Sequence, residues 1–127
     1  MSIKYKTIQK AQPGVAGGGD KKFYASPVYQ GEKTLEGLTK DIEKISTVSG
    51  ADIRAVLYAL VDVMQTSLSE GRIVRLGELG SMRVSLSSEG KAKEEEVTSA
   101  AIRNTKVLFT QGSDLKKMLQ TLKFEKA

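Results

Sequence analysis

Hydrophobic residues repeat with a helical period in the middle of the chain. Apolar side chains recur at intervals of three and four residues over positions 35–45 and again over positions 53–68. This spacing predicts two helices: one capped by Thr34 and running to about Ser46, and one that begins after Ser49 and ends at Gly71. Because only two or three residues separate the helices, we expect a helical hairpin.

Alternating apolar and polar residues predict strands on both sides of this hairpin. Before it, residues 3–10 and 23–29 are expected to pair as antiparallel strands joined by a Gly-rich loop, with Pro27 confining the second strand to a sheet edge or bulge. After it, residues 72–76, 81–86 and 103–109 are three further predicted strands. The polar residues 87–101 have almost nothing to bury, so we expect a protruding ribbon or a mobile loop.

The end of the chain is predicted to hold one more helix. Ser113 and Asp114 open it, and its apolar set is Leu115, Met118, Leu119 and Leu122. Residues 124–127 are expected to be a frayed tail. The organisation is therefore α+β: an N-terminal strand extension over residues 1–33, a main domain over residues 34–123 with an arm at about 87–101, and a tail at 124–127.

Composition narrows the possible functions. The chain has 127 residues, which fits one domain, and it contains no Cys, no His and no Trp. These absences exclude thiol nucleophiles, disulfides, Cys/His zinc sites and imidazole acid–base chemistry. No credible carboxylate pair at a cleft presents itself, so we expect no enzyme, no cofactor and no small-molecule substrate.

No membrane association or export is expected. No stretch approaches the roughly 18–20 apolar residues of a membrane span, and the N-terminus lacks the apolar core of a signal peptide. Cytoplasmic residence is therefore the prediction.

Charge is unevenly distributed along the chain, whose net charge is +5. Residues 1–33 carry six basic groups against two acidic ones, and residues 72–127 carry eleven against seven. Residues 34–71, which include both predicted helices of the hairpin, carry three basic groups against six acidic ones. A polyanionic partner would therefore contact the flanking segments and not the exposed face of the hairpin.

The second predicted helix carries more apolar surface than one small sheet can cover. Burying the surplus at about 25 cal/mol per Å² favours a second copy of the chain. We therefore expect a homodimer, in which two-fold symmetry would place the two sheets side by side.

Two motifs resemble the HU and integration host factor family of bacterial DNA-binding proteins. The first is EGRIVRLGELGSMRV at residues 70–84, and the second is VLFTQGSDLK at residues 107–116. The resemblance covers roughly residues 35–123 and implies an intertwined dimer with a helical body and a three-stranded saddle. It also implies two β-arms that grip duplex DNA through the minor groove.

The predicted arm departs from the family pattern. It lacks the Pro that wedges between bases and has no Arg, and it carries the acidic run Glu94-Glu95-Glu96. Carboxylates beside a phosphate backbone are repulsive unless they point away from it. Gln111 also stands where the family tends to have Pro.

Seven cations are candidate DNA-binding residues. Arg83 is the first choice, because it alternates with Met82 and Val84 and so faces away from the apolar side of its strand. Arg72 and Arg75 have opposite parity, so at most one of them faces the saddle. The full set is Arg83, Arg75, Arg72, Lys91, Lys93, Arg103 and Lys106.

A separate basic cluster lies in the N-terminal extension. It could extend the binding surface or shield a sheet edge, since Lys commonly guards edge strands, and edge protection is slightly favoured. The cluster comprises Lys4, Lys6, Lys10, Lys21 and Lys22.

The sequence leads to two functional hypotheses. The first is sequence-nonspecific binding of double-stranded DNA by a histone-like, architectural homodimer of the bacterial nucleoid. The alternative is an HU-like protein–protein interaction module with weak or no DNA binding, which the acidic run and the missing wedge motivate.

Overall fold

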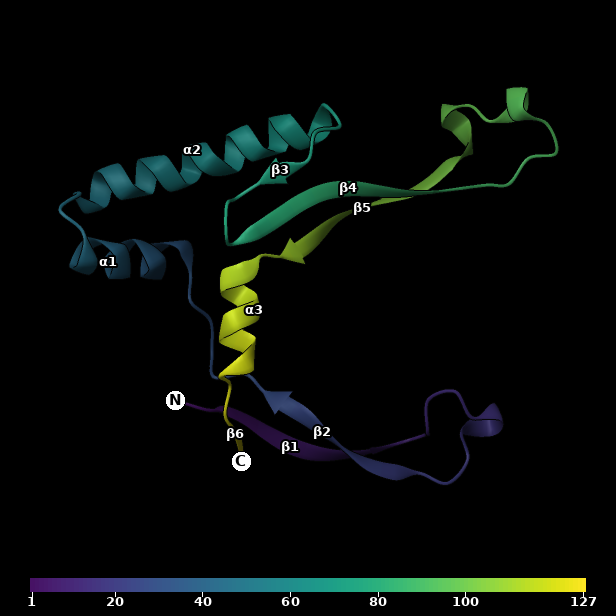
Figure 1. Ribbon diagram of the computed structural model, residues 1–127, viewed down its shortest axis with the longest axis horizontal. Coiled ribbons are helices and arrows are strands. Elements are labelled where there is room, and N and C mark those ends of the chain that lie inside the picture. Colours follow the sequence, from purple (N-terminus) through teal and green to yellow (C-terminus); the bar gives the residue numbers. More distant parts are fainter. The chain divides into compact units, whose positions relative to one another are not determined.

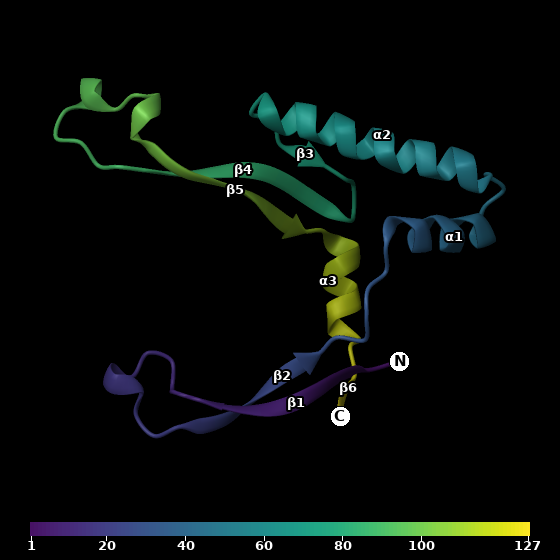
Figure 2. The ribbon, with the colours of Figure 1, turned by 180° about the vertical axis from the view of Figure 1, so that it is seen from behind.

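The computed structural model describes all 127 residues, and the chain divides into two compact units (Figures 1 and 2). One unit comprises Met1–Thr34 together with Met118–Ala127, and the other is Leu35–Lys117. The boundary between them falls within helix α3 (Ser113–Gln120). The predicted boundaries differ at this end, because residues from Met118 onward group with the N-terminal strands.

A helical hairpin begins the second unit. Helices α1 (Leu35–Ile45) and α2 (Gly50–Ser69) follow the predicted segments closely. The Ser49 hydroxyl caps α2 by accepting from the Asp52 amide at 3.3 Å, and Glu43 Oε2 accepts from the Gly50 amide at 2.6 Å. Gly71 follows the helix at a φ of +80°, as predicted for its C-terminal turn.

The second unit also contains an antiparallel sheet in the order β3-β4-β5. Strand β3 (Val74–Arg75) is shorter than the predicted 72–76. The Arg72 amide still donates to the Ser67 carbonyl, and the Leu76 amide already donates to the Gly80 carbonyl across the next turn, so the strand is confined between these two bonds. The longer strands are β4 (Gly80–Ser88) and β5 (Ile102–Gln111).

The segment that connects β4 to β5 is more ordered than the sequence predicted. It contains two short 3₁₀ turns, η2 (Glu94–Glu96) and η3 (Ser99–Ala101). The Glu89 amide donates to the Ala101 carbonyl at 2.8 Å, and Ala101 is buried. The expectation that this segment has almost nothing to bury is therefore wrong at its C-terminal end.

The first unit is a three-stranded sheet in the order β2-β1-β6. Strands β1 (Ile3–Lys10) and β2 (Lys22–Val28) are antiparallel, and the loop between them contains the short turn η1 (Ala16–Gly18). Both the predicted strand pair and the edge position of Pro27 are confirmed, since β2 is an outer strand.

The predicted frayed tail is wrong. Residues Phe124–Lys126 form strand β6, which pairs in parallel with residues Ile3 to Tyr5 of β1. The Ile3 amide donates to the Lys123 carbonyl at 2.8 Å, and the Ala127 amide donates to the Tyr5 carbonyl at 2.9 Å. These hydrogen bonds satisfy backbone groups that an isolated tail would leave to water.

A single chain has almost no hydrophobic core. Ile53 and Ala101 are its only buried hydrophobic residues, and the buried Thr39 satisfies its hydroxyl by donating to the Leu35 carbonyl. The chain exposes 10454 Å², against about 6,600 Å² expected for a compact monomer of this mass. None of the helices combines the length and the apolar character that a membrane span needs.

Candidate nucleic-acid interface

The β3-β4-β5 sheet has one polar and one apolar face. Directly paired residues share a face, and the register pairs Arg75 with Ser81, Arg83 with Leu108, and Ser85 with Lys106. We call the side with these residues the polar sheet face; it comprises Arg75, Ser81, Arg83, Ser85, Ser87, Asn104, Lys106, Leu108 and Thr110. The apolar sheet face comprises Val74, Met82, Val84, Leu86, Thr105, Val107 and Phe109.

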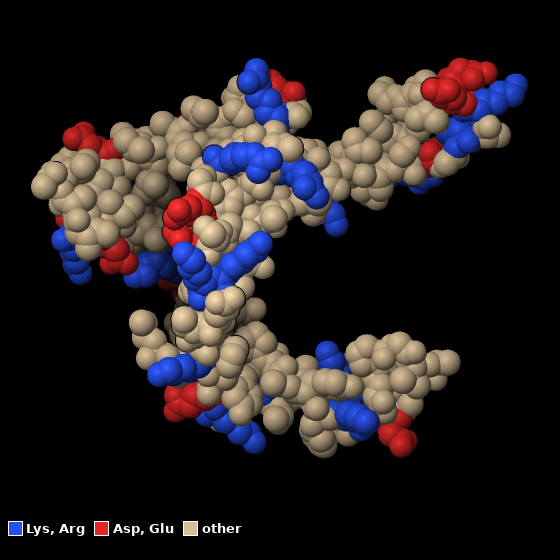
Figure 3. Space-filling view, in the orientation of Figure 1, with Lys and Arg blue, Asp and Glu red and all other residues tan.

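Three of the predicted DNA-binding residues therefore lie on one surface. Arg75, Arg83 and Lys106 each come from a different strand of the polar sheet face, and all three are exposed. None of them forms an ion pair. In Figure 3, Lys and Arg side chains gather over the base of this sheet, and acidic side chains lie beside further Lys and Arg side chains at the far end of its connecting segment. The polar sheet face can thus accept an anionic ligand at three points without breaking an internal salt bridge.

Two hollows lie beside cations of the polar sheet face. One cavity of about 190 Å³ includes Arg75, Ser81 and Thr110 in its lining, and another of about 340 Å³ includes Asn104 and Lys106 together with Leu86 and Thr105 of the apolar sheet face. Each places hydroxyl or amide groups beside a cation. Such groups hydrogen-bond the oxygens of phosphates and sugars, which position a nucleic acid without reading its bases.

Two glycines allow the turns to approach strand β5 closely. A Cβ at Gly80 would lie 2.4 Å from the Thr110 carbonyl oxygen, and one at Gly112 would lie 2.2 Å from the Glu78 carbonyl oxygen. Both distances are below any real Cβ contact, so a larger residue would force the backbone apart. Gly80 therefore serves close packing between β4 and β5.

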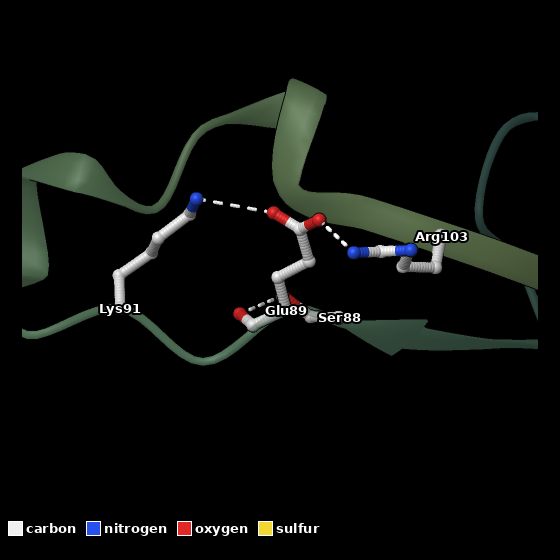
Figure 4. A network of polar contacts seen from close by, with 4 residues as sticks. All are labelled: Ser88, Glu89, Lys91 and Arg103. Carbon is white, nitrogen blue, oxygen red and sulfur yellow. Dashed lines mark hydrogen bonds and ion pairs between the residues drawn. The ribbon is translucent and has the colours of Figure 1, made fainter.

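Two other predicted DNA-binding residues, Lys91 and Arg103, form ion pairs with Glu89, a residue that was not among the predicted site residues. Figure 4 shows Glu89 between them: Lys91 Nζ lies 3.0 Å from Glu89 Oε2, and the Arg103 guanidinium contacts Glu89 Oε1. Arg103 also lies beside the irregularity in the β4–β5 register at Ser87 and Ser88, outside the polar sheet face. Their charge is partly neutralised within the arm, so they are weaker candidates than Arg83.

The last two candidates lie outside the regular strands. Arg72 follows the turn at Gly71, and its Nε lies 3.0 Å from Glu70 Oε2. Of Arg72 and Arg75, only Arg75 lies in the sheet register, on the polar sheet face. Lys93 is the N-terminal neighbour of η2, next to Glu94–Glu96.

The uncharged members of the polar sheet face were not proposed as site residues from the sequence. Ser81, Ser85, Asn104 and Thr110 share the parity of Arg83 or Lys106 on their strands. Parity within each strand was visible in the sequence, but the register between β4 and β5 decides which residues become neighbours. The structure alone supplies that register.

The comparisons with known proteins agree with this architecture. The family model described as HU-HIG, "HU domain fused to wHTH, Ig, or Glycine-rich motif", matches residues 1–126. A crystal structure from Bacteroides vulgatus ATCC 8482, provisionally described as a bacterial DNA-binding protein, superposes with a TM-score of 0.64 at 17% identity. The superposition covers 98% of this chain and 48% of that one, so the chain spans about half the length of its structural neighbour. No curated protein matches the sequence.

Proposed function

We propose that the chain, which belongs to the HU-HIG family, binds duplex DNA without sequence preference as a homodimeric, architectural protein of the bacterial nucleoid. The observation that carries the proposal is the polar sheet face, where Arg75, Arg83 and Lys106 are exposed and unpaired. Cations of this kind neutralise phosphates and release counterions, which favours binding to any sequence.

The missing core supports dimerisation. On α2, Val56, Leu60 and Val63 recur at helical spacing and are 64%, 41% and 63% exposed in the single chain. The single chain exposes ~3,800 Å² more than a compact monomer of its mass, so apolar surface remains for a partner to cover. A second copy of the chain, which presents the same apolar surface, is the partner of matching chemistry under two-fold symmetry.

The proposed binding mode does not include a kink made by an intercalating proline. The segment between β4 and β5 contains no Pro, and its η2 turn consists of Glu94, Glu95 and Glu96. Phosphate contacts from the sheets therefore supply the affinity, and the acidic turn points away from the DNA backbone in the complex.

Salt titration tests the proposal. Fluorescence anisotropy would follow binding to three unrelated 40-base-pair duplexes between 50 and 200 mM KCl. Three cations per chain on the polar sheet face give six in a dimer, so these contacts alone should make log K fall against log[salt] with a slope of about −5.4, and the three sequences should bind alike. Absent binding at 50 mM, or an affinity that does not change with salt, would contradict the proposal.

The acidic η2 turn favours a second candidate function, a module that holds another protein. Three neighbouring exposed carboxylates offer a site for a basic partner surface. Pull-down after nuclease treatment separates the two functions, because a DNA-mediated association is lost and a direct one survives. Substitution of Glu94, Glu95 and Glu96 by Gln should then abolish the surviving association.

A further inference from the structure

The N-terminal β2-β1-β6 sheet also has two different faces. By register, the even-numbered residues of β1 share one side with Tyr24, Val28 and Glu125. We call this side the basic sheet face, because it carries Lys4, Lys6, Lys10 and Lys22. The opposite side is mainly apolar and carries Ile3, Tyr5, Phe23, Ala25, Pro27 and Phe124.

Side-chain contacts confirm which residues share the basic sheet face. Lys4 Nζ lies 3.6 Å from Glu125 Oε2, across the β1–β6 pairing. Lys10 Nζ lies 4.9 Å from the centre of the Tyr24 ring, across the β1–β2 pairing. Both contacts join residues that the register places on the same side.

The positive charge on the basic sheet face is compensated only at the end where Lys4 lies. Its only carboxylate, Glu125, lies beside Lys4, whereas Lys6, Lys10 and Lys22 form no ion pair. Lys10 and Lys22 are directly opposite each other in the register. Like charges in such a position repel and destabilise the pairing, and a bound anion would relieve this repulsion.

We propose that the basic sheet face is a second DNA-binding surface, which contacts the phosphate backbone of duplex DNA through Lys6, Lys10 and Lys22. The inference rests on the proposed function and adds a surface from the other compact unit of the chain. Lys6 and Lys10 are four residues apart on one strand, which corresponds to about 13 Å at the usual strand rise. Because a DNA strand presents one phosphate about every 3.4 Å along the helix axis, the row spans several phosphates of one backbone.

The register separates these lysines from Lys4. At Lys4 the strand β1 is paired on both sides, with β2 and β6, whereas Lys6 and Lys10 lie beyond the end of β6 and Lys22 lies on the outer strand β2, where edge protection and anion binding are compatible. Half-buried Ile8, Tyr24 and Val28 lie among the lysines on the same face and offer apolar support to the lysine stems. The ammonium groups are thereby presented to solvent as a row along the face.

A triple variant tests the surface. Substitution of Lys6, Lys10 and Lys22 by Gln should make the salt dependence of duplex binding shallower by about 2.7 for each sheet that engages the DNA. At 0.1 M salt the affinity should fall by about 500-fold for each sheet that engages the DNA, if each contact contributes 0.9 log units per decade below 1 M. Replacing the same three residues by Arg should preserve both the slope and the affinity.

A matched control removes the same number of charges elsewhere. Lys126 lies on the apolar side of the same sheet, and Lys40 and Lys44 are exposed on α1. Substitution of these three residues by Gln should leave the slope close to that of the wild type. If the control makes the slope as much shallower as the triple variant does, net charge and not the basic sheet face explains the effect, and the inference is wrong.

Thermal melts and a double variant distinguish a loss of DNA binding from a loss of folding. Because Lys10 contacts Tyr24, thermal melts followed by circular dichroism would verify folding. The double variant of Lys6 and Lys22 should still make the slope shallower by about 1.8 for each sheet that engages the DNA. Normal duplex binding by a folded triple variant overturns the inference but leaves the proposed function intact, even if the variant loses affinity for anionic phosphatidylglycerol vesicles. A wild-type chain that does not bind DNA overturns both.

Discussion

Replacing Arg83 by Gln should weaken DNA binding through a defined loss of phosphate contacts. Arg83 lies on β4 opposite Leu108, is exposed, and forms no ion pair, so its removal breaks no internal contact of that kind. A dimer loses two cations, which should make the salt slope less negative by about 1.8. At 0.1 M salt the corresponding loss of affinity is up to about 60-fold, equal for every duplex sequence.

Arg103→Gln is the matched control for this experiment. Arg103 carries the same charge on the neighbouring strand, but its guanidinium contacts Glu89 and it lies outside the polar sheet face. Its substitution should leave the salt slope near the wild-type value. Anisotropy titrations of one 40-base-pair duplex at four salt concentrations would measure both variants, after thermal melts show that both are folded. Equal slope changes for the two variants would refute the assignment of the polar sheet face as the binding surface.

Three further substitutions test the proposed dimer interface, the close packing at Gly80 and the cap on α2. Leu60→Asp on α2 should dissociate the dimer in analytical ultracentrifugation, since an unpaired charge would enter the proposed interface; a variant that stays dimeric contradicts that interface. Gly80→Ala should cost more than about 2 kcal/mol in urea unfolding, because its Cβ would clash with the Thr110 carbonyl, whereas Gly90→Ala, with open space around it, should change little. Glu43→Gln should lower the free energy of unfolding by about 0.5–1 kcal/mol through a weaker cap on α2, and an unchanged urea midpoint would argue against that cap.

Local sequence determined the two helices of the hairpin and which side of β4 each of its residues faces. The intervals of three and four residues predicted α1 and α2, and Ser49 and Gly71 marked the ends of α2, because caps and left-handed turns depend on neighbouring residues alone. Alternation on β4 separated Arg83 from Met82 and Val84 for the same reason. The family resemblance carried by residues 70–84 and 107–116 is confirmed by the match to the HU-HIG model.

Tertiary structure decided what depends on contacts between distant residues. Strand β6 is three residues long, too short for a recognisable alternation, and it exists through pairing with β1 at the other end of the chain. The register of β4 with β5 brought Lys106 onto the face of Arg83, while Glu89 drew Arg103 and Lys91 into ion pairs. Backbone pairing and charge neutralisation depend on distances in space, and a periodic pattern within one segment contains no information about its partners.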